Sequence, residues 1–570
     1  MKKTFFKKMS VTASALAATL LVASCGNSPA GNGTETAKDT TAPTTAPTTA
    51  STGDSTAGSD ASSGEGDAYL NIALNSDIVS MDVHKTTNDY LVPMNVFDTL
   101  FTTVKNPDGS TTLVNSLADD YSISEDGLTY SITLKDGIVF SDGTPLTADD
   151  VKFTFERILT LPESAQTDYA IAIDGAQDML DGKASELRGI TVIDDTHLTI
   201  TLAEPFAVFL AQLAAPSTSI MSRSITTNAG DDFGVVPEKT LGTGPYVVTS
   251  WDKGVGLTFE YNPHYWGTEP SVKKVTAKVM DSSSMDMAFQ KGDLDILDCM
   301  MLDSAIVDSV YKTSYSDKIV SVDRLGMNYL MLNEDSEPLN DVNVRKAIQM
   351  AIDRKSILDS IYEGDGNLED GIYPTGCLGY SKDNQGWLSY DPEGAKKLLA
   401  DSGYPDGFEM EISLDSGNND ASKNTVQVIA QNLNDVGIKA DVKTYDHASW
   451  LDLRNSGKMN SFLALWILDY NDPDNIIYTF FGSKSNSAIR SCNYSDEATI
   501  ARVAAARAIV DPVERITEYG NLEKKLIQDD AAWVPLFSLK HLYVVSDRVE
   551  SFTPHWAGWS DIYFTGVELK

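Results

Sequence analysis

The sequence predicts a protein of mixed α/β class. Residues 130–134 alternate between apolar and polar side chains, as a half-buried strand does. Residues 425–436 carry apolar side chains at helical spacing, Gly437 follows, and residues 438–442 alternate again. Residues 511–526 begin with Asp-Pro, which favours a helix start, and continue with an apolar stripe. Because helical and strand patterns interleave, we predict an α/β or mixed architecture.

The N-terminal segment predicts export. Lysines at positions 2, 3, 7 and 8 precede an apolar and small-residue run over residues 9–24, which is too short for a confident membrane span. The run ends in LVASCG at residues 21–26, which resembles the lipobox of bacterial lipoproteins. We therefore expect residues 1–24 to be a signal peptide and Cys25 to carry lipid. An ordinary secretory signal with a chance cysteine is the alternative.

The next segment has the composition of a tether. Residues 26–68 are nearly all small or polar, and Thr-Ala-Pro-Thr recurs within residues 41–51. Such a segment cannot bury apolar surface, so we expect residues 25–68 to be a lipidated cysteine followed by a disordered linker. No later segment has the pattern of a membrane span, so lipid would be the sole membrane anchor.

Length and charge narrow the class of protein. A chain of 570 residues suggests two to four packed units. Its net charge of −38 opposes binding to nucleic acid, whose phosphates are also negative. The acidity fits a solvated surface, and attraction of cationic ligands is the alternative. After Cys25, three cysteines remain, so one disulfide at most can form among Cys299, Cys377 and Cys492.

Motifs of catalysis and metal binding are absent from the sequence. It contains no G-x-S-x-G and no H-E-x-x-H, and no two of its six histidines lie within one helical turn of each other. Residues 469–480 do not form a calcium loop, because Pro473, Asp474 and Phe480 occupy its fifth, sixth and twelfth positions. We expect no enzyme activity, no cofactor and no metal, although distant residues could still converge on a metal site.

Several motifs of the sequence resemble those of one protein family. The longest stretch reads DGLTYSITLKDG at residues 126–137 and FSDGTPLTADDV at residues 140–151. Further matches in family order are SMDVH at 80–84, GTGPY at 242–246, NPHYWG at 262–267, GDLD at 292–295, DVNVRKAI at 341–348, AIDR at 351–354 and WILDYNDPDN at 466–475. The first of these departs from the family's S-L-D-P-H by a methionine and a valine. Together these motifs resemble the family 5 extracellular solute-binding proteins of bacterial ABC importers. That family includes oligopeptide-, dipeptide- and nickel-binding receptors.

The resemblance implies a two-lobed periplasmic-binding-protein-like fold of type II, cluster C. In such a fold the ligand is enclosed between two lobes joined by crossover strands, and the N-terminal lobe carries an extra subdomain. We expect lobe I at residues 69–105, 236–325 and 546–570. The extra subdomain would cover residues 106–235, and lobe II residues 326–545.

The resemblance also implies where a peptide would bind. In the family's peptide binders the aspartate of W-x-x-D pairs with the ligand ammonium, and here that residue is Asp469, preceded by Trp466. A buried ammonium needs such a carboxylate because an unpaired buried cation is unstable. Tyr470, Asn471 and Tyr90 are the other expected ligand contacts. A turn-capping role is the alternative for Asp469, and turn roles are expected for the following Asp472 and Asp474.

The implied function is capture of peptides outside the cytoplasm for an ABC permease, with the chain attached to the cell membrane by lipid. Nickel, haem or glycan ligands on the same receptor remain alternatives, as does a surface adhesion or chaperone-like role. Peptide length, the partner of a ligand carboxylate and the identity of the permease do not follow from the sequence.

Overall fold

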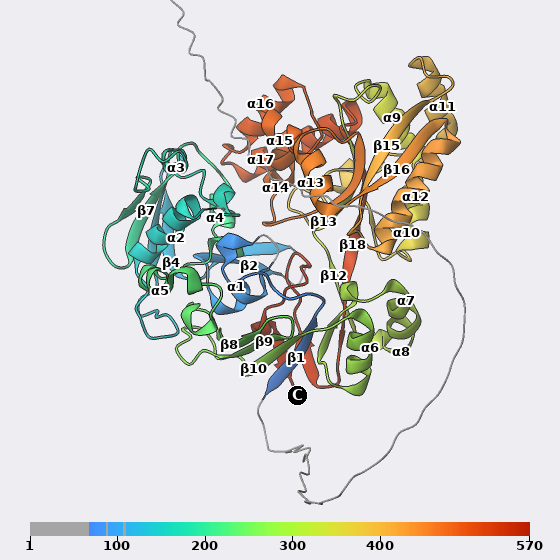
Figure 1. The fold of residues 1–570 in the computed structure, drawn as a ribbon. Coiled ribbons are helices and arrows are strands. Elements are labelled where there is room, and N and C mark those ends of the chain that lie inside the picture. The colour runs from blue at the N-terminus through green and yellow to red at the C-terminus, as the bar shows by residue number, and fades with distance from the viewer. Residues whose placement is uncertain (1–67, 87–88, 107–109, 163) are drawn as a thin grey trace, which may run out of the picture. The chain divides into compact units, whose positions relative to one another are not determined.

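The computed structural model describes residues 68–86, 89–106, 110–162 and 164–570. The predicted signal peptide, Cys25 and all of the predicted tether except Ala68 lie outside these residues. Helices and strands alternate through the described chain, which confirms the mixed α/β class (Figure 1).

Among the described residues, most strands belong to one twelve-stranded hydrogen-bonded sheet, which divides into two groups. The first group, called lobe I here, contains β1 (Tyr69–Leu74), β8 (Tyr246–Asp252), β9 (Gly256–Tyr261), β10 (Lys274–Val279), β11 (Ile296–Asp298) and β12 (Ile319–Asp323). The second group contains β13 (Gly326–Leu332), β14 (Gly366–Leu368), β15 (Phe408–Asp415), β16 (Ile438–Tyr445) and β17 (Ser461–Ile467). We call residues 326–539, which hold the second group, lobe II.

Two segments carry the chain between the lobes. The long strand β18 (Trp533–Val545) pairs with β13 and β14 through its first half and with β11 and β12 through its second half. Beside it, β12 runs into β13 after two residues, Arg324 and Leu325. The backbone N–H of Arg324 donates to the carbonyl of Leu539 at 3.1 Å, so the two segments stay paired at the crossing. Figure 1 shows β12 and β18 running together between the two groups of strands.

A separate four-stranded sheet and the segments that pack on it are called the subdomain here. Its strands are β4 (Ala118–Ile123), β5 (Thr129–Leu134), β6 (Ile190–Val192) and β7 (His197–Thr201), in the order β4-β5-β7-β6. The predicted strand over 130–134 is therefore confirmed as β5. Helix α2 (Ala148–Thr160) covers this sheet and starts with a capping box between Thr147 and Asp150. The hairpin of β2 (Phe101–Lys105) and β3 (Thr111–Asn115) lies between the subdomain sheet and lobe I in sequence.

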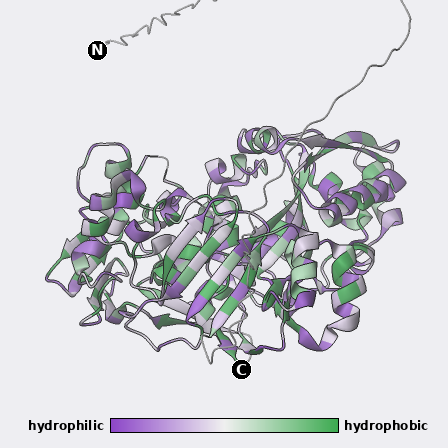
Figure 2. Ribbon diagram, turned by 60° about the horizontal axis from the view of Figure 1, so that its bottom comes forward, coloured by the Kyte–Doolittle hydropathy of each residue, from purple (hydrophilic) through white to green (hydrophobic). Residues whose placement is uncertain are grey.

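Helices of lobe II pack on its sheet. The predicted helix over 425–436 is α12 (Asp420–Asp435), and the strand predicted after it is β16. Gly437 between them has φ +97°, a conformation that favours glycine. The other helices on this sheet are α9 (Val342–Ala351), α10 (Arg354–Ile361), α11 (Pro392–Asp401) and α13 (His447–Asn455). Figure 2 shows hydrophilic and hydrophobic residues alternating along the helices, as amphipathic packing requires.

A group of helices follows β17 in the chain and belongs to lobe II. They are α14 (Asp474–Phe481), α15 (Lys484–Ala488), α16 (Glu497–Ala506) and α17 (Pro512–Lys524). The predicted helix start at Asp511 is confirmed, because its side chain accepts hydrogen bonds from the N–H groups of Val513 and Glu514. Tyr519 and Leu522 of the predicted stripe are fully buried.

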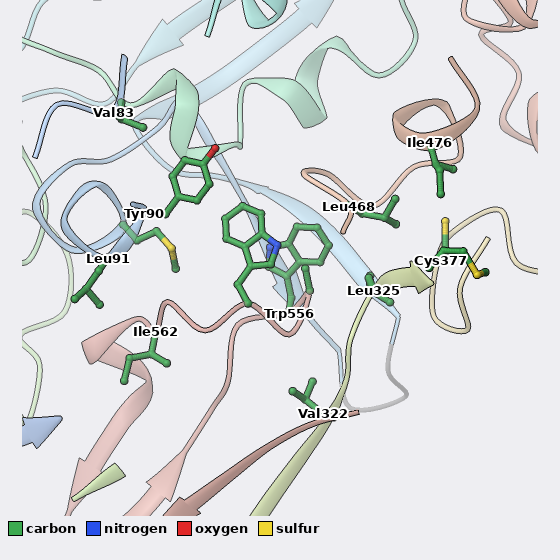
Figure 3. Packing of buried hydrophobic residues seen from close by; sticks show 14 of the residues in the cluster. Val83, Tyr90, Leu91, Val322, Leu325, Cys377, Leu468, Ile476, Trp556 and Ile562 are labelled. Atoms are coloured by element: carbon green, nitrogen blue, oxygen red, sulfur yellow. The ribbon is translucent and has the colours of Figure 1, made fainter. Parts of the chain in front are cut away.

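The largest buried cluster takes residues from both lobes. It includes Tyr90 and Trp556 outside lobe II, together with Leu468 and Cys377 inside it (Figure 3). Cys299, Cys377 and Cys492 are all buried and free, so no disulfide forms among them. Within the described residues, none of the helices has the length and apolarity that a membrane crossing needs.

Candidate functional site

Asp469 lies just after β17, on the segment that leads into α14. Its Oδ2 accepts a hydrogen bond from Asn475 Nδ2 at 3.1 Å. The Asn475 side-chain oxygen in turn accepts a hydrogen bond from Trp466 Nε1 at 2.9 Å. Asn475, in the first turn of α14, therefore fixes the positions of both predicted site residues. The signal for Asn475 was present in the sequence, as the last residue of WILDYNDPDN.

The charge on Asp469 is not neutralised by a contact. Among the described residues no cation forms an ion pair with this carboxylate. Burial raises the pKa of Asp469 to about 6, with the Asp168 charge adding to the rise, while the Asn475 hydrogen bond and the positive charge of Arg490 oppose it. A cation that enters the site would stabilise the charged form of this buried carboxylate. A buried carboxylate without a cationic partner is the kind of group that a desolvated ammonium requires.

The charge of Asp469 acts on two tyrosines outside lobe II. Tyr90 is buried and stacks on Trp559 with ring centroids 5.0 Å apart, and its hydroxyl lies 3.5 Å from Ser217 Oγ. Burial raises the pKa of Tyr90 to about 12, and the negative charge of Asp469 contributes to that rise. Burial also raises the pKa of Tyr169, on the subdomain, and the negative charge of Asp469 adds to that rise. Tyr90 and Tyr169 thus lie within electrostatic range of Asp469.

Tyr470 and Asn471 hold the loop to other parts of the chain. Tyr470 is buried in the cluster of the subdomain core, and its hydroxyl donates to Asp474 Oδ2 at 3.2 Å. Asn471 Nδ2 donates to Thr111 Oγ1 at 3.0 Å and to the carbonyl of Gly376 at 3.2 Å. The structure places both residues beside Asp469, with their polar groups already engaged by protein. Their contact with ligand stays a prediction.

Asp472 and Asp474 do more than form a turn. Asp472 accepts two hydrogen bonds of 2.6 Å from Arg515, and both side chains are buried. Asp474 accepts a hydrogen bond from Tyr519 at 2.8 Å and lies 3.2 Å from Arg507. The turn contact also exists, because the N–H of Asp474 donates to Asp472 Oδ1 at 2.8 Å. These ion pairs were not predictable from the local sequence, since Arg507 lies just after α16 and Arg515 lies in α17.

Other residues of the site carried no sequence signal. Arg490 stacks over Trp466, with its guanidinium carbon 5.3 Å from the ring centroid. Asp168 of the subdomain influences the pKa values of both Asp469 and Arg490. His555 lies between Trp559 and Tyr563, at centroid distances of 4.4 and 5.7 Å. These residues come from segments that are remote in the sequence, so only the fold brings them together.

A cavity of about 460 Å³ lies beside this region. Trp266, His555 and Trp556 line it, and none of its lining residues belongs to lobe II. A ligand enclosed between the lobes would not be surrounded by this cavity alone, so Asp469 remains the centre of the candidate site. Within the described part of the chain, no group of three or more His, Cys, Asp or Glu side chains could hold a metal ion.

The family model for bacterial extracellular solute-binding proteins, family 5 (middle) matches residues 112–488. The chain belongs to this family. The family resemblance is therefore confirmed, and the chain is a family 5 solute-binding protein of an ABC importer, a binding protein and not an enzyme.

Curated relatives agree with this assignment. The chain is 28% identical over 449 residues to the probable D,D-dipeptide-binding periplasmic protein DdpA of Escherichia coli, covering 78% of this chain and 83% of that one. It is 27% identical over 479 residues to heme-binding protein A of Haemophilus influenzae, covering 81% and 85% of the two chains. These relatives are named for different ligands, so family membership alone does not choose the ligand.

Solved structures confirm the two-lobed fold. The periplasmic binding protein DppA of Helicobacter pylori, in complex with the peptide STSA, superposes with a TM-score of 0.71 at 26% identity, covering 88% of this chain and 98% of that one. An oligopeptide-binding protein of Borrelia burgdorferi superposes with a TM-score of 0.73 at 22% identity, covering 88% and 100%. The second similarity supports the fold only.

Proposed function

We propose that this family 5 protein captures short peptides with a free N-terminus between its two lobes and delivers them to an ABC permease. The observation that carries the proposal is the recessed carboxylate of Asp469, which no cation of the described residues contacts. Relatives support it: one is named a probable D,D-dipeptide-binding protein, and the Helicobacter pylori structure holds the peptide STSA.

The physical basis is the complementarity of two charges. An ammonium group that enters the site loses its hydration, and a fixed carboxylate offsets that loss. Because every peptide has the same N-terminal group, one acid can serve cargo with different side chains. Trp466, Tyr470, Asn471 and Tyr90 would then surround the first residues of the peptide.

Closure of the lobes would complete the site. The paired crossing of β12–β13 and β18 gives the lobes a common hinge, and closure would exclude water and strengthen the contact with Asp469. The closed surface would be the form that the permease recognises. Transport energy would come from the importer's ATPase.

The remaining proposals concern the membrane. Lipid on Cys25 would hold the chain on the extracytoplasmic face of the cell membrane, and residues 26–68 would let the lobes reach the permease. Cys25→Ser tests the anchor: cells fed a radiolabelled fatty acid should label the wild type and not the variant. Equal labelling of both proteins would remove Cys25 as the site.

Calorimetric titration tests the cargo. Wild-type protein should bind di- to tetrapeptides, bind their N-acetylated forms at least about tenfold more weakly, and return the peptides intact. Asp469→Asn keeps the size of the side chain and its position beside Asn475. This variant should lose the preference for free-amine peptides over their N-acetylated forms. Haem, nickel and glycans serve as competing ligands. Saturable binding of one of these, with none of peptides, would contradict the proposal.

A further inference from the structure

The subdomain contacts lobe II at a place apart from the hinge. The N–H of Ala207, between β7 and α4 (Phe209–Gln212), donates to the carbonyl of Arg507 across 3.0 Å, and Arg507 directly follows α16. Among the described residues, every other backbone hydrogen bond between lobe II and the rest of the chain involves β18 or the two residues that link β12 to β13. Figure 1 shows α4 on the side of the subdomain that faces α14 and α17.

The Arg507 side chain bridges the same two parts. Its guanidinium carbon lies 4.0 Å from the ring centroid of Phe206 in the subdomain and 3.7 Å from that of Tyr478 in α14. An arginine between two aromatic faces is attracted to both of them. Phe206 is itself buried in the subdomain core, and its carbonyl accepts a hydrogen bond from the Tyr130 hydroxyl at 3.2 Å. Phe206, Ala207 and Arg507 are called the clasp here.

Asp474 connects the clasp to a second contact between the subdomain and lobe II. Its Oδ1 lies 3.2 Å from Arg507 Nε, and its Oδ2 accepts a hydrogen bond from the Tyr470 hydroxyl at 3.2 Å. The Tyr470 ring packs in the core of the subdomain although the residue belongs to lobe II. One carboxylate at the start of α14 therefore positions two side chains that reach from lobe II to the subdomain.

The candidate ammonium site is attached to the next residue of the same helical turn. Asn475 donates to Asp469 at 3.1 Å and accepts the indole N–H of Trp466 at 2.9 Å. Asp474 and Asn475 are both buried in the first turn of α14, where close packing prevents one from moving without the other. A displacement of this turn therefore changes the clasp and the site of Asp469 together.

The clasp is not packed as tightly as the interior of a lobe. The Arg507 side chain is 23% exposed, and its Nε makes no hydrogen bond to the described residues. Val510, three residues further along the chain, is 68% exposed. Such a contact can open without exposing a large apolar surface, as segments of low local stability do. The clasp can therefore form and break while the parts on both sides stay folded.

We propose that the clasp holds the subdomain against lobe II while ligand is bound and sets the rate at which the ligand leaves. The inference rests on the proposed peptide function and adds a kinetic role for the subdomain. A peptide bound at Asp469 would fix Asn475 and with it the first turn of α14, which keeps Asp474 in place for Arg507. Related complexes differ mostly in their dissociation rates, so loss of the clasp should appear there.

Rapid mixing of the protein with Ala-Ala-Ala tests the rate. Tryptophan fluorescence recorded at several peptide concentrations gives the association rate constant from the slope and the dissociation rate constant from the intercept. Arg507→Met should raise the dissociation rate constant at least about tenfold and leave the association rate constant within about threefold of wild type. Phe206→Leu keeps an apolar side chain but removes the aromatic face, so it should raise the dissociation rate constant about threefold or more.

Two comparisons assign the effect to the clasp. Arg502→Met is the matched control, because Arg502 is an exposed arginine of α16 paired with Glu518, and it should release peptide as wild type does. The double variant Arg507→Met with Phe206→Leu should release peptide about as fast as Arg507→Met alone, because the two side chains act through one contact. Circular dichroism melts verify that each variant folds.

Hydrogen exchange reports on the clasp directly. In the wild type, the Ala207 amide should exchange more slowly with saturating Ala-Ala-Ala than without it, because its N–H then donates to Arg507 for more of the time. Arg507→Met should reduce this slowing, while amides within β7 should not respond to peptide in either protein.

The outcomes separate this inference from the proposed function. Wild-type dissociation rates in both Arg507→Met and Phe206→Leu, or an Ala207 amide that peptide does not protect, would overturn the inference and leave the peptide function standing. Failure of the wild type to bind any di- to tetrapeptide would overturn both.

Discussion

Asn475 donates a hydrogen bond from Nδ2 to Asp469 Oδ2 across 3.1 Å. Asn475 is itself buried at the start of α14, so it holds the carboxylate from the protein side and leaves the other carboxylate oxygen for a ligand.

Asn475→Leu should weaken peptide binding near neutral pH. The substitution removes a hydrogen bond to a charged group, which is worth about 1.5–3 kcal/mol, and it also frees the Trp466 indole. We expect an affinity loss of about tenfold to a hundredfold in calorimetric titration. Asn521→Leu, on the exposed face of α17, is the control and should bind as wild type does. Wild-type affinity in Asn475→Leu would show that the hydrogen bond does not support the site.

Peptide affinity should depend on pH in a bell shape. Binding needs the Asp469 carboxylate, whose pKa burial raises to about 6, and a charged α-amino group, whose ordinary pKa is about 7.7–8.0. Affinity should therefore be greatest at about pH 7, fall as pH drops below about 6, and fall again above about 8.

Titrations over this range check the prediction, with Asp469→Asn as the comparison. The variant should bind weakly and lack the acid limb, because it has no carboxylate to protonate. An acid limb that persists in Asp469→Asn would assign the titration to another group.

Breaking the buried pair of Asp472 and Arg515 should destabilise the fold. Asp472→Leu or Arg515→Met leaves one buried charge without its partner, a loss of about 3–5 kcal/mol in the free energy of unfolding. The double variant Asp472→Leu with Arg515→Met should lose less than the two single losses added together. Urea denaturation measures each value.

An exposed pair provides the control for that experiment. Arg502→Met breaks the contact with Glu518 on the surface, where about 0–1 kcal/mol is expected. If the buried variants lost as little as this control, the pair inside the protein would contribute nothing to stability.

Glu523 should make the protein less stable as pH rises from about 4.5 to 7. Its carboxylate is fully buried, accepts hydrogen bonds from the N–H groups of Ile372 and Tyr373, and faces Asn384. Burial raises its pKa to about 7, with the Glu369 charge adding to the rise. The folded-state pKa is above the unfolded value of about 4.3. The protonated carboxyl group of Glu523 therefore stabilises the folded state fully below about pH 4.3, and this stabilisation is lost as the pH rises through about 7.

Glu523→Gln removes the titrating carboxyl group, so the free energy of unfolding of the variant should change less with pH over this range. The difference between wild type and variant in the free energy of unfolding should shift by about 2–3 kcal/mol between those pH values. Urea melts at matched pH values measure it. Parallel pH profiles for the two proteins would show that Glu523 does not titrate in this range.

Local patterns in the sequence predicted the elements but not the site. The alternation at 130–134 and the spacing at 425–436 arise from one face of a strand or helix, and each gave its element within a few residues. Motif resemblance identified the family and predicted Asp469 as the acid that contacts the ligand. Arg490, in contrast, belongs to no pattern, because its position over Trp466 comes from packing between two separate segments. Asp472 was predicted as a turn residue for the same reason: its partner Arg515 lies on a helix whose docking no local pattern records.

The paired crossing of β12–β13 and β18 also makes the molecule anisotropic in its mechanics. β12 and β13 are each hydrogen-bonded to β18, so shearing them past β18 breaks several bonds at once, whereas bending the three strands out of the plane of the sheet breaks few. Thermal energy should therefore favour a single low-frequency mode, flexure across the ribbon. The strands should therefore resist a force applied along their length and bend under a force applied perpendicular to the sheet.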